Sequence, residues 1–225
     1  MPQAHRSHLH QPATMSQLMP DTVFTIGHST HTQAYFVGLL LRNGITALCD
    51  VRSKPYSRMN PQFNREELKA ALQEHGIKYV FLGKELGARS EDPACYENGR
   101  VKYDRLAQTD LFRLGLERVQ NGMKEYHIAL MCAEKEPLEC HRAILVARHL
   151  AAHGVNVQHI HADGILESHT AALDRLRRAL NLPEDDMFRS SGDVSDDAYR
   201  IQETRIAYEA SPPGVPDEAP RSAAG

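Results

Sequence analysis

The chain has 225 residues, of which 41% are hydrophobic, and a formal net charge of −3 at pH 7. This composition can bury one full core, and we expect a single domain with tails. The charge gives no overall basic field, so a nucleic-acid partner would need a local groove. No apolar run approaches the roughly 18 residues of a membrane span, and no signal-peptide core precedes the domain, so we expect a cytoplasmic protein without membrane contact. Its four cysteines are expected to be reduced thiols.

Short apolar runs alternate with helical periodicities along the first part of the domain. Each run ends in polar residues, as the first does at Gly27-His28-Ser29 and the second at Asp50-Val51-Arg52. The apolar spacing predicts helices between the runs, and Gly76 stops the second helix. The predicted strands here are Val23–Ile26, 45–51 and 77–82, and the predicted helices run through Phe36 to Asn43 and from Arg65 to His75.

The second part of the domain opens with a stretch that lacks periodicity. Residues 83–101 combine glycine and charge with a lone proline, and so long a loop predicts a lid or specificity loop. Strands and helices then alternate again. The predicted elements are a helix over 104–122, a strand over 126–131, a helix that Gly154 ends, a fifth strand over 155–161 and a last helix through Leu173, Leu176 and Leu180.

The expected domain spans residues 21–182. Residues 1–20 have no hydrophobic period and are expected to be a disordered leader. Residues 183–225 are rich in proline and small or acidic residues and are expected to be mostly disordered, apart from a short helix over 195–208. Strands that alternate with helices predict an α/β fold: an open, mostly parallel sheet of about five strands with helices on both faces, a Rossmann-like architecture.

The stretch from Cys132 to Arg142 is the first place to look for chemistry, because reactive side chains crowd into one predicted strand-to-helix turn. Pro137 can open the helix, since its fixed φ suits a first turn. The free N–H groups and the dipole of a helix N-terminus favour an anion or a thiolate. We therefore predict a lowered pKa for Cys140, with Cys132 as its resolving or metal-ligating partner.

Polar residues that follow parallel strands meet at one edge of a sheet, so we expect one cleft at that edge. A catalytic thiol needs a base or a cation to hold its thiolate. The predicted catalytic residues are Cys132, Glu134, Cys140 and His141. The predicted substrate-binding residues are His28, Ser29, Asp50, Arg52, Ser57 and Arg142, with the planar fork of Arg142 on a bound anion.

Other interpretations of these residues remain open. Zinc accepts sulfur and nitrogen ligands, so Cys132, Cys140, His141 and His28 could form a tetrahedral zinc site instead. Asp50 and Arg52 could form a structural salt bridge. His159 and His161 share a strand face and either belong to the site or flank the sheet edge. Arg142 lies ten residues after Cys132, which does not match the Cys-x5-Arg loop of phosphatases and rhodaneses, so neither activity is predicted.

Several spaced motifs resemble those of domain-of-unknown-function family 488. The motifs are Gly27-His28-Ser29, Asp50-Val51-Arg52 with Pro55 and Ser57, Phe63, Leu86-Gly87, Cys132-x-Glu134 and Cys140-His141-Arg142. They agree in order from about residue 23 to 176. The resemblance implies a compact α/β domain with a cysteine-rich polar site, and it implies no reaction.

Two classes of function follow from these observations. The first is an enzyme that uses Cys132 or Cys140 as a nucleophile or redox thiol on a small anionic substrate, a nucleotide being one such ligand. The second is a module that binds a nucleotide or nucleic acid without chemistry. Zinc is the one cofactor that the residues suggest, and the sequence leaves the oligomeric state open.

Overall fold

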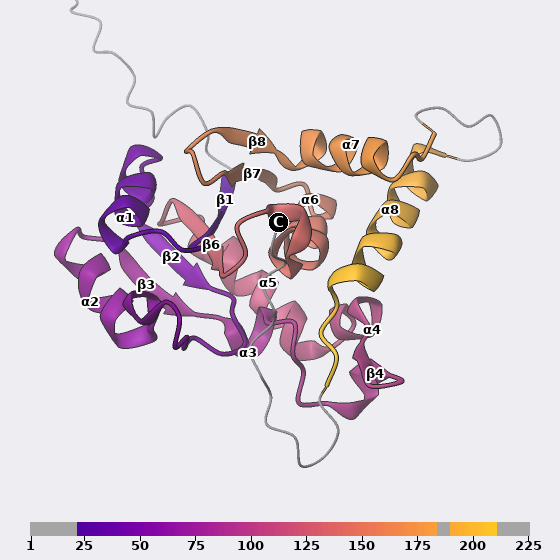
Figure 1. Cartoon of the computed structure of the whole chain (residues 1–225), viewed down its shortest axis with the longest axis horizontal. Coiled ribbons are helices and arrows are strands. Elements are labelled where there is room, and N and C mark those ends of the chain that lie inside the picture. The colour runs from indigo at the N-terminus through magenta and orange to yellow at the C-terminus, as the bar shows by residue number, and fades with distance from the viewer. Residues whose placement is uncertain (1–21, 184–189, 211–225) are drawn as a thin grey trace, which may run out of the picture.

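The computed structural model of the chain describes residues 22–183 and 190–210, so the predicted leader 1–20 lies outside the described residues. A sheet in the order β3-β2-β6-β1-β7-β8 forms the centre (Figure 1). The first five of these strands pair in parallel, and β8 pairs antiparallel with β7. The strands are β1 Thr22–Gly27, β2 Ala47–Asp50, β3 Lys78–Phe81, β6 Ile128–Cys132, β7 Asn156–Ile160 and β8 Leu166–Ser168.

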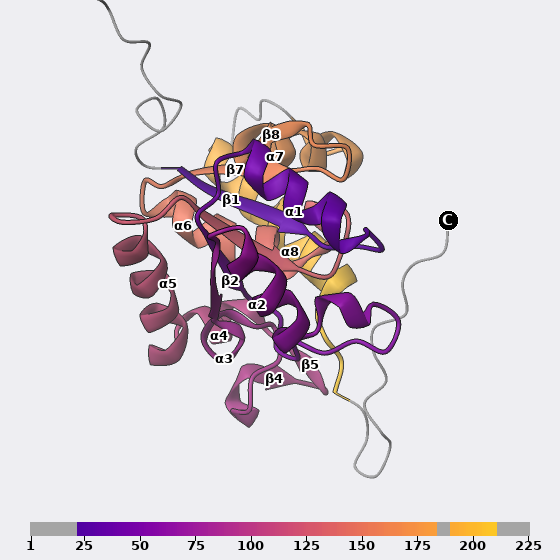
Figure 2. The same cartoon turned by 90° about the vertical axis from the view of Figure 1, so that its left-hand side faces the viewer.

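Helices cover both faces of this sheet, α1 and α2 on one face and α5 and α6 on the other (Figures 1 and 2). The helices are α1 Gln33–Arg42, α2 Arg65–Glu74, α3 Gly83–Leu86, α4 Tyr103–Ala107, α5 Asp110–Gly122, α6 Arg148–Ala152, α7 His169–Ala179 and α8 Ser191–Ile206. Short 3-10 turns span Pro61–Phe63, Pro93–Cys95 and Pro137–Glu139, and a π-helical turn spans Arg142–Ala147. A small hairpin consists of β4 Tyr96–Glu97 and β5 Arg100–Val101.

Each face of the sheet buries its own apolar cluster. On one face Phe36 of α1 and Leu72 of α2 are fully buried in a cluster with Ile26 of β1. On the other face Phe112 of α5 joins a cluster with Leu130 of β6. Strands buried on both sides read as continuous apolar runs, which is why β1, β2 and β6 were predictable from sequence.

The predicted α/β class is confirmed, with a layer architecture of the Rossmann-like kind. Numbered within the sheet alone, the strand order is 3-2-4-1-5-6, whereas dinucleotide-binding Rossmann sheets have 3-2-1-4-5-6. The difference places β6 between β1 and β2. The carboxyl end of β6, where Cys132 lies, is therefore flanked by the two other strands that end in polar motifs.

Some local details differ from the expected fold, although the mostly parallel sheet of about five strands is confirmed. The sheet has a sixth strand, β8, whose three residues are too short for a period to be visible. The helix predicted over 104–122 is broken, because Thr109 caps a new helix by accepting a hydrogen bond from the Phe112 amide. The stretch 83–101 contains α3 and the β4–β5 hairpin rather than one irregular loop.

The C-terminal part of the chain also differs from its expectation. Within the stretch 183–225, helix α8 begins at Ser191, four residues before the predicted helix. It runs from the end of α7 toward α4 and the hairpin (Figure 1). After α8 the chain pairs with the hairpin, where the Val101 amide donates to the Tyr208 carbonyl. Residues 184–189 and 211–225 lie outside the described part of the chain.

Candidate functional site

The polar ends of β1, β2 and β6 meet at the carboxyl edge of the sheet. Gly27 pairs with Cys132, and the next amide, that of His28, donates to the Cys132 carbonyl at 2.9 Å. On the other side of β6, the Val51 amide donates to the Met131 carbonyl at 3.0 Å. The strand pairing thus brings the three motifs together, although they are far apart in sequence.

Two thiols and an imidazole form the centre of the site. His141 Nδ1 lies 3.7 Å from the sulfur of Cys132 and 3.8 Å from that of Cys140. The other ring nitrogen, Nε2, lies 3.1 Å from the Val51 carbonyl oxygen. A carbonyl oxygen only accepts, so Nε2 carries the hydrogen in this arrangement and Nδ1 turns its lone pair toward both sulfurs in the neutral ring. The Cys140 sulfur also lies 3.0 Å from a carboxylate oxygen of Glu134.

The charges around the thiols favour one ionised sulfur. Burial alone would raise the pKa of Cys140, but a hydrogen bond from Cys132 and the cations Arg142 and His141 outweigh it and hold the pKa well below the usual range. Burial, and then the neighbouring Cys140, raise the pKa of Cys132 well above its usual range. Burial would lower the pKa of His141, yet the Cys140 thiolate and Glu134 raise it. The two thiols are thus shifted in opposite directions, and Cys140 is the more acidic of the pair. Glu134, whose pKa is raised by burial and then by Cys140, lies on the other side of this sulfur, so the two groups share one proton.

Arg142 braces the loop that follows β6. Its guanidinium is fully buried and donates to the carbonyls of Glu134 at 2.8 Å and Lys135 at 3.1 Å. Its backbone amide lies 3.4 Å from the Cys140 sulfur. Gly27 permits this close loop, because a Cβ at that position would lie 1.8 Å from the Glu134 carbonyl oxygen. Both ends of the fork that was predicted to hold an anion therefore already bind carbonyls.

A second polar group lies at the end of β2. Arg52 donates to both carboxylate oxygens of Asp50, at 2.9 and 2.7 Å, and to the Phe63 carbonyl. It also lies 3.2 Å from His28 Nε2, which must accept because a guanidinium only donates. Burial, and then Arg52, lower the pKa of His28 to about 4. The salt bridge between Asp50 and Arg52, which the sequence left open as the alternative to substrate binding, is present, and Tyr79 donates a hydrogen bond to Asp50 at 2.7 Å.

The two predicted substrate-binding serines have different surroundings. The Ser29 amide donates to the Ala133 carbonyl, and Ser29 adopts a positive φ of 49°. The Ser57 hydroxyl accepts from the Asn60 amide, and the Ser57 amide donates to the Asn64 side chain. Ser57 thus bonds within its own loop, whereas Ser29 lies beside the loop after β6.

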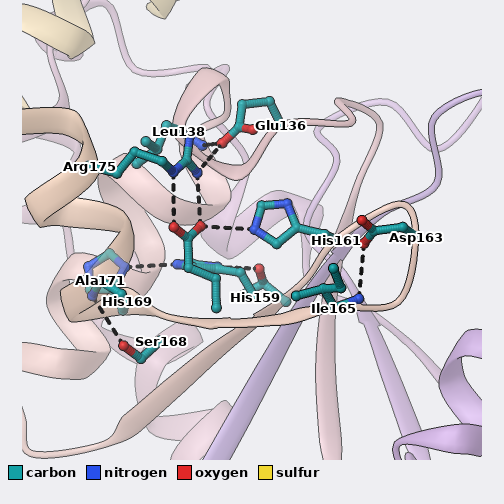
Figure 3. A network of polar contacts seen from close by, with 12 residues as sticks. Glu136, Leu138, His159, His161, Asp163, Ile165, Ser168, His169, Ala171 and Arg175 are labelled. Carbon is teal, nitrogen blue, oxygen red and sulfur yellow. Dashed lines mark hydrogen bonds and ion pairs between the residues drawn. The ribbon is translucent and has the colours of Figure 1, made fainter. Parts of the chain in front are cut away.

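His159 and His161 belong to separate networks (Figure 3). His161 binds Glu167 at 2.9 Å, and Arg175 joins Glu167 to Glu136, the residue that caps the 3-10 turn Pro137–Glu139. His159 forms part of a buried chain of hydrogen bonds. That chain runs from Thr25 through His159 and His169 to the Tyr199 hydroxyl, with distances of 2.7, 3.0 and 2.8 Å.

Sequence spacing gave no sign of His169 or Tyr199 in that chain. They lie on α7 and α8, and only the tertiary fold brings them to β7. The same holds for Gln202 and Glu203 of α8, which are buried against the Cys132 to Arg142 region and α4. No pattern in the sequence of α8 indicates that these two polar residues are buried.

The fold and site define an α/β protein with a buried dithiol–imidazole cluster at the carboxyl edge of its sheet. The family model described as "Domain of unknown function DUF488" matches residues 32–149, which is more than half of the chain. The chain belongs to this family. The matched interval contains β2, β6 and the whole stretch from Cys132 to Arg142, and it begins after the Gly27-His28-Ser29 motif.

No curated protein and no solved structure matches the chain. Within residues 22–183 and 190–210, no helix is long and apolar enough to cross a membrane.

Proposed function

We propose that this protein is a cysteine-dependent enzyme with Cys140 as the nucleophile and His141 as its proton partner. The observation that carries this function is the position of His141, whose Nδ1 faces both sulfurs while Nε2 is fixed by the Val51 carbonyl. A thiolate next to a positioned imidazole is the arrangement that activates cysteine nucleophiles. Cys132 would serve as a hydrogen-bond donor to the thiolate or as its resolving thiol.

The buried charge of Arg142 favours an anion at the Cys140–Glu134 pair. Burying a cation without a counter-charge is costly. In the described part of the chain no carboxylate forms an ion pair with Arg142, because Asp50 already pairs with Arg52 and Arg142 binds carbonyls. Cys140 and Glu134 lie 3.0 Å apart and share one proton, so this pair provides one negative charge near Arg142, whose amide donates to the Cys140 sulfur.

The proposed substrate is small and anionic, with nucleotides among the ligands to test. Both sulfurs are almost fully buried, which limits the size of the group that reaches them. The Nε of Arg142 is buried and lacks a hydrogen-bond acceptor in the described part of the chain. It is a charged donor without an acceptor, and a substrate anion would be a suitable one.

The proposed reaction is nucleophilic displacement in two steps. The Cys140 thiolate forms a bond to the electrophilic atom of the substrate, and the leaving group departs with its electron pair and takes a proton from the His141 imidazolium. Water then attacks the covalent adduct while His141, now neutral, accepts a proton from it. The second step restores the Cys140 thiolate and the protonated His141.

Alkylation by iodoacetamide as a function of pH, read by peptide mass, tests this function. We expect Cys140 to react at a pH well below that at which Cys132 reacts, and Cys140→Ser to abolish the reaction at that site. His141→Gln should shift the alkylation of Cys140 to higher pH, because the cation beside the thiolate is lost. Inert cysteines combined with a thermal shift by nucleotides would instead support the binding module.

A zinc site is the second candidate, and the distances favour it specifically. The ligand atoms of Cys132, Cys140 and His141 all lie within 4.8 Å of one another. Zinc bond lengths imply about 3.6 Å between a nitrogen and a sulfur ligand of a tetrahedron, close to the 3.7 and 3.8 Å observed. The Val51 carbonyl also fixes the tautomer of His141, as outer partners of metal-binding histidines do.

The fourth ligand considered from sequence, His28, does not join this group, because its two ring nitrogens contact Arg52 and Ser29. Three protein ligands with an open position are typical of catalytic zinc rather than structural zinc. The metal content of the purified full-length chain decides between the candidates. One equivalent of zinc that protects both thiols until a chelator is added would favour the metal site over the free thiolate.

A further inference from the structure

The proposed nucleophile is covered by the chain itself. Cys132 is 3% exposed and Cys140 is 2% exposed, so a substrate reaches them only when some element moves. The Cys140 loop, residues 133–142, lies between the strands of the sheet and α8. Helix α8 contacts both the 3-10 turn Pro137–Glu139 before Cys140 and the π-helical turn Arg142–Ala147 after it.

Polar contacts fasten α8 to this region. Gln202 donates to the Leu138 carbonyl at 2.9 Å, two residues before Cys140. The Glu203 carboxylate accepts from the Tyr103 amide of α4 at 3.0 Å. Tyr199 bonds to His169 of α7 at 2.8 Å. The helix therefore connects three separate parts of the chain, namely α4, α7 and the Cys140 loop.

The buried face of α8 is less apolar than the faces of the core helices. Its buried residues are Val194, Ala198, Tyr199, Gln202 and Glu203, whereas α1 buries four apolar residues. The Gln202 side-chain oxygen is buried without a hydrogen-bond partner in the described part of the chain, and an unpaired buried acceptor weakens the docked state. Elements that bury few apolar groups are those that open first.

Helix α8 also carries its own stabilising contacts. Ser190 and Asp193 form a reciprocal capping box at its N-terminus. Arg200 and Asp197 form an ion pair within the helix. These local interactions do not depend on docking, so the segment keeps helical order when it leaves the surface.

We propose, on the basis of the thiol enzyme proposed above, that α8 is a gate over the thiol site. Undocking of α8 frees the Leu138 carbonyl and loosens the turn before Cys140, which opens a path to the sulfur. The docked state excludes water and large thiol-reactive molecules from the Cys140 thiolate. Substrate entry and thiol protection are then governed by the same helix.

Tyr199→Phe in the full-length chain tests the gate, because it removes the hydroxyl that binds His169 and keeps the ring. Arg205→Lys is the matched control, since Arg205 is exposed on the same helix and lysine keeps its charge. Hydrogen exchange of residues 191–206 and alkylation of Cys140 are measured together, with chelator present. In Tyr199→Phe both rates should rise by the same factor, about fivefold for the loss of one ordinary hydrogen bond. Both rates should stay unchanged in Arg205→Lys.

Two results would overturn the gate. One is faster exchange of α8 in Tyr199→Phe with no change in Cys140 alkylation. The other is a wild-type chain in which the amides of α8 exchange no faster than those of β6. That result would mean that α8 opens only when the whole domain unfolds. Alkylation at pH 9, normalised to the rate in the unfolded chain, reports exposure even of a thiol with an ordinary pKa. Failure of the gate is therefore distinguishable from failure of the proposed nucleophile.

Discussion

Replacement of Arg142 by methionine should damage both the fold and the thiol site. Methionine fills much of the same space but leaves the carbonyls of Glu134 and Lys135 buried without their charged donors. A hydrogen bond to a charged group contributes about 1.5 to 3 kcal/mol, so the loss of two should lower the free energy of unfolding by about 3 to 5 kcal/mol. Urea unfolding measures this loss, which is a large share of the roughly 5 to 15 kcal/mol of an ordinary domain.

The same replacement should raise the pKa of Cys140, because a cation that holds its thiolate is removed. Arg142→Lys separates the two roles, since lysine keeps the charge and lacks the fork that reaches two carbonyls. It should lose stability and keep the alkylation profile of Cys140 near that of the wild type. Arg113→Met, at an exposed ion pair with Asp110, is the control and should change stability by less than about 1 kcal/mol. An Arg142→Met protein as stable as this control, with an unmoved Cys140 profile, would refute the assigned role.

Acid should destabilise the fold, because burial lowers the pKa of His28 and of His169 from 6.5 to about 4. Between pH 6.5 and 4 the unfolded chain therefore binds more protons than the folded chain, so the free energy of unfolding should fall by about 2 to 3 kcal/mol per histidine over this range. Urea titrations at each pH measure this fall, which should be smaller in His169→Gln. Gly27→Ala should lower the free energy of unfolding by about 3 kcal/mol or more, or prevent folding, because its Cβ would lie 1.8 Å from a carbonyl oxygen. In the control Gly38→Ala on α1, the added Cβ has no neighbour within 4 Å, and the protein should not be destabilised. Truncation after Leu182, which looked harmless from sequence, should lower the melting temperature by several degrees because α8 is lost, and an unchanged melting curve would contradict the docking described.

The sheet and the meeting of the polar motifs were predictable because each depends on short-range patterns. Buried parallel strands appear as apolar runs, and their polar ends must share an edge whatever the strand order. The prediction that the motifs at His28, Asp50 and Cys132 meet follows from those two facts. The insertion of β6 between β1 and β2 was not predictable, because runs of similar composition do not specify which strands pair.

The roles of individual side chains required the fold. Arg142 was expected to bind an anion, yet its terminal nitrogens brace the loop after β6, a contact that depends on a loop path allowed by Gly27. Helix α8 was reduced to a short segment in a tail, because its buried face mixes polar residues with few apolar ones. The burial of Tyr199, for example, depends on a hydrogen bond to His169 of another helix, and no local pattern in α8 indicates this contact.

The pH dependence of Cys140 alkylation in the full-length, chelator-treated chain tests the central claim most directly. Free cysteine ionises near pH 8.5, and the cations around Cys140 hold its pKa well below the usual range. Cys140 should therefore be modified with a midpoint well below 8.5, while Cys132 stays unmodified at that pH and Cys140→Ser removes the reaction. Midpoints near 8.5 for both cysteines after normalisation to the rate in the unfolded chain would contradict a nucleophilic Cys140.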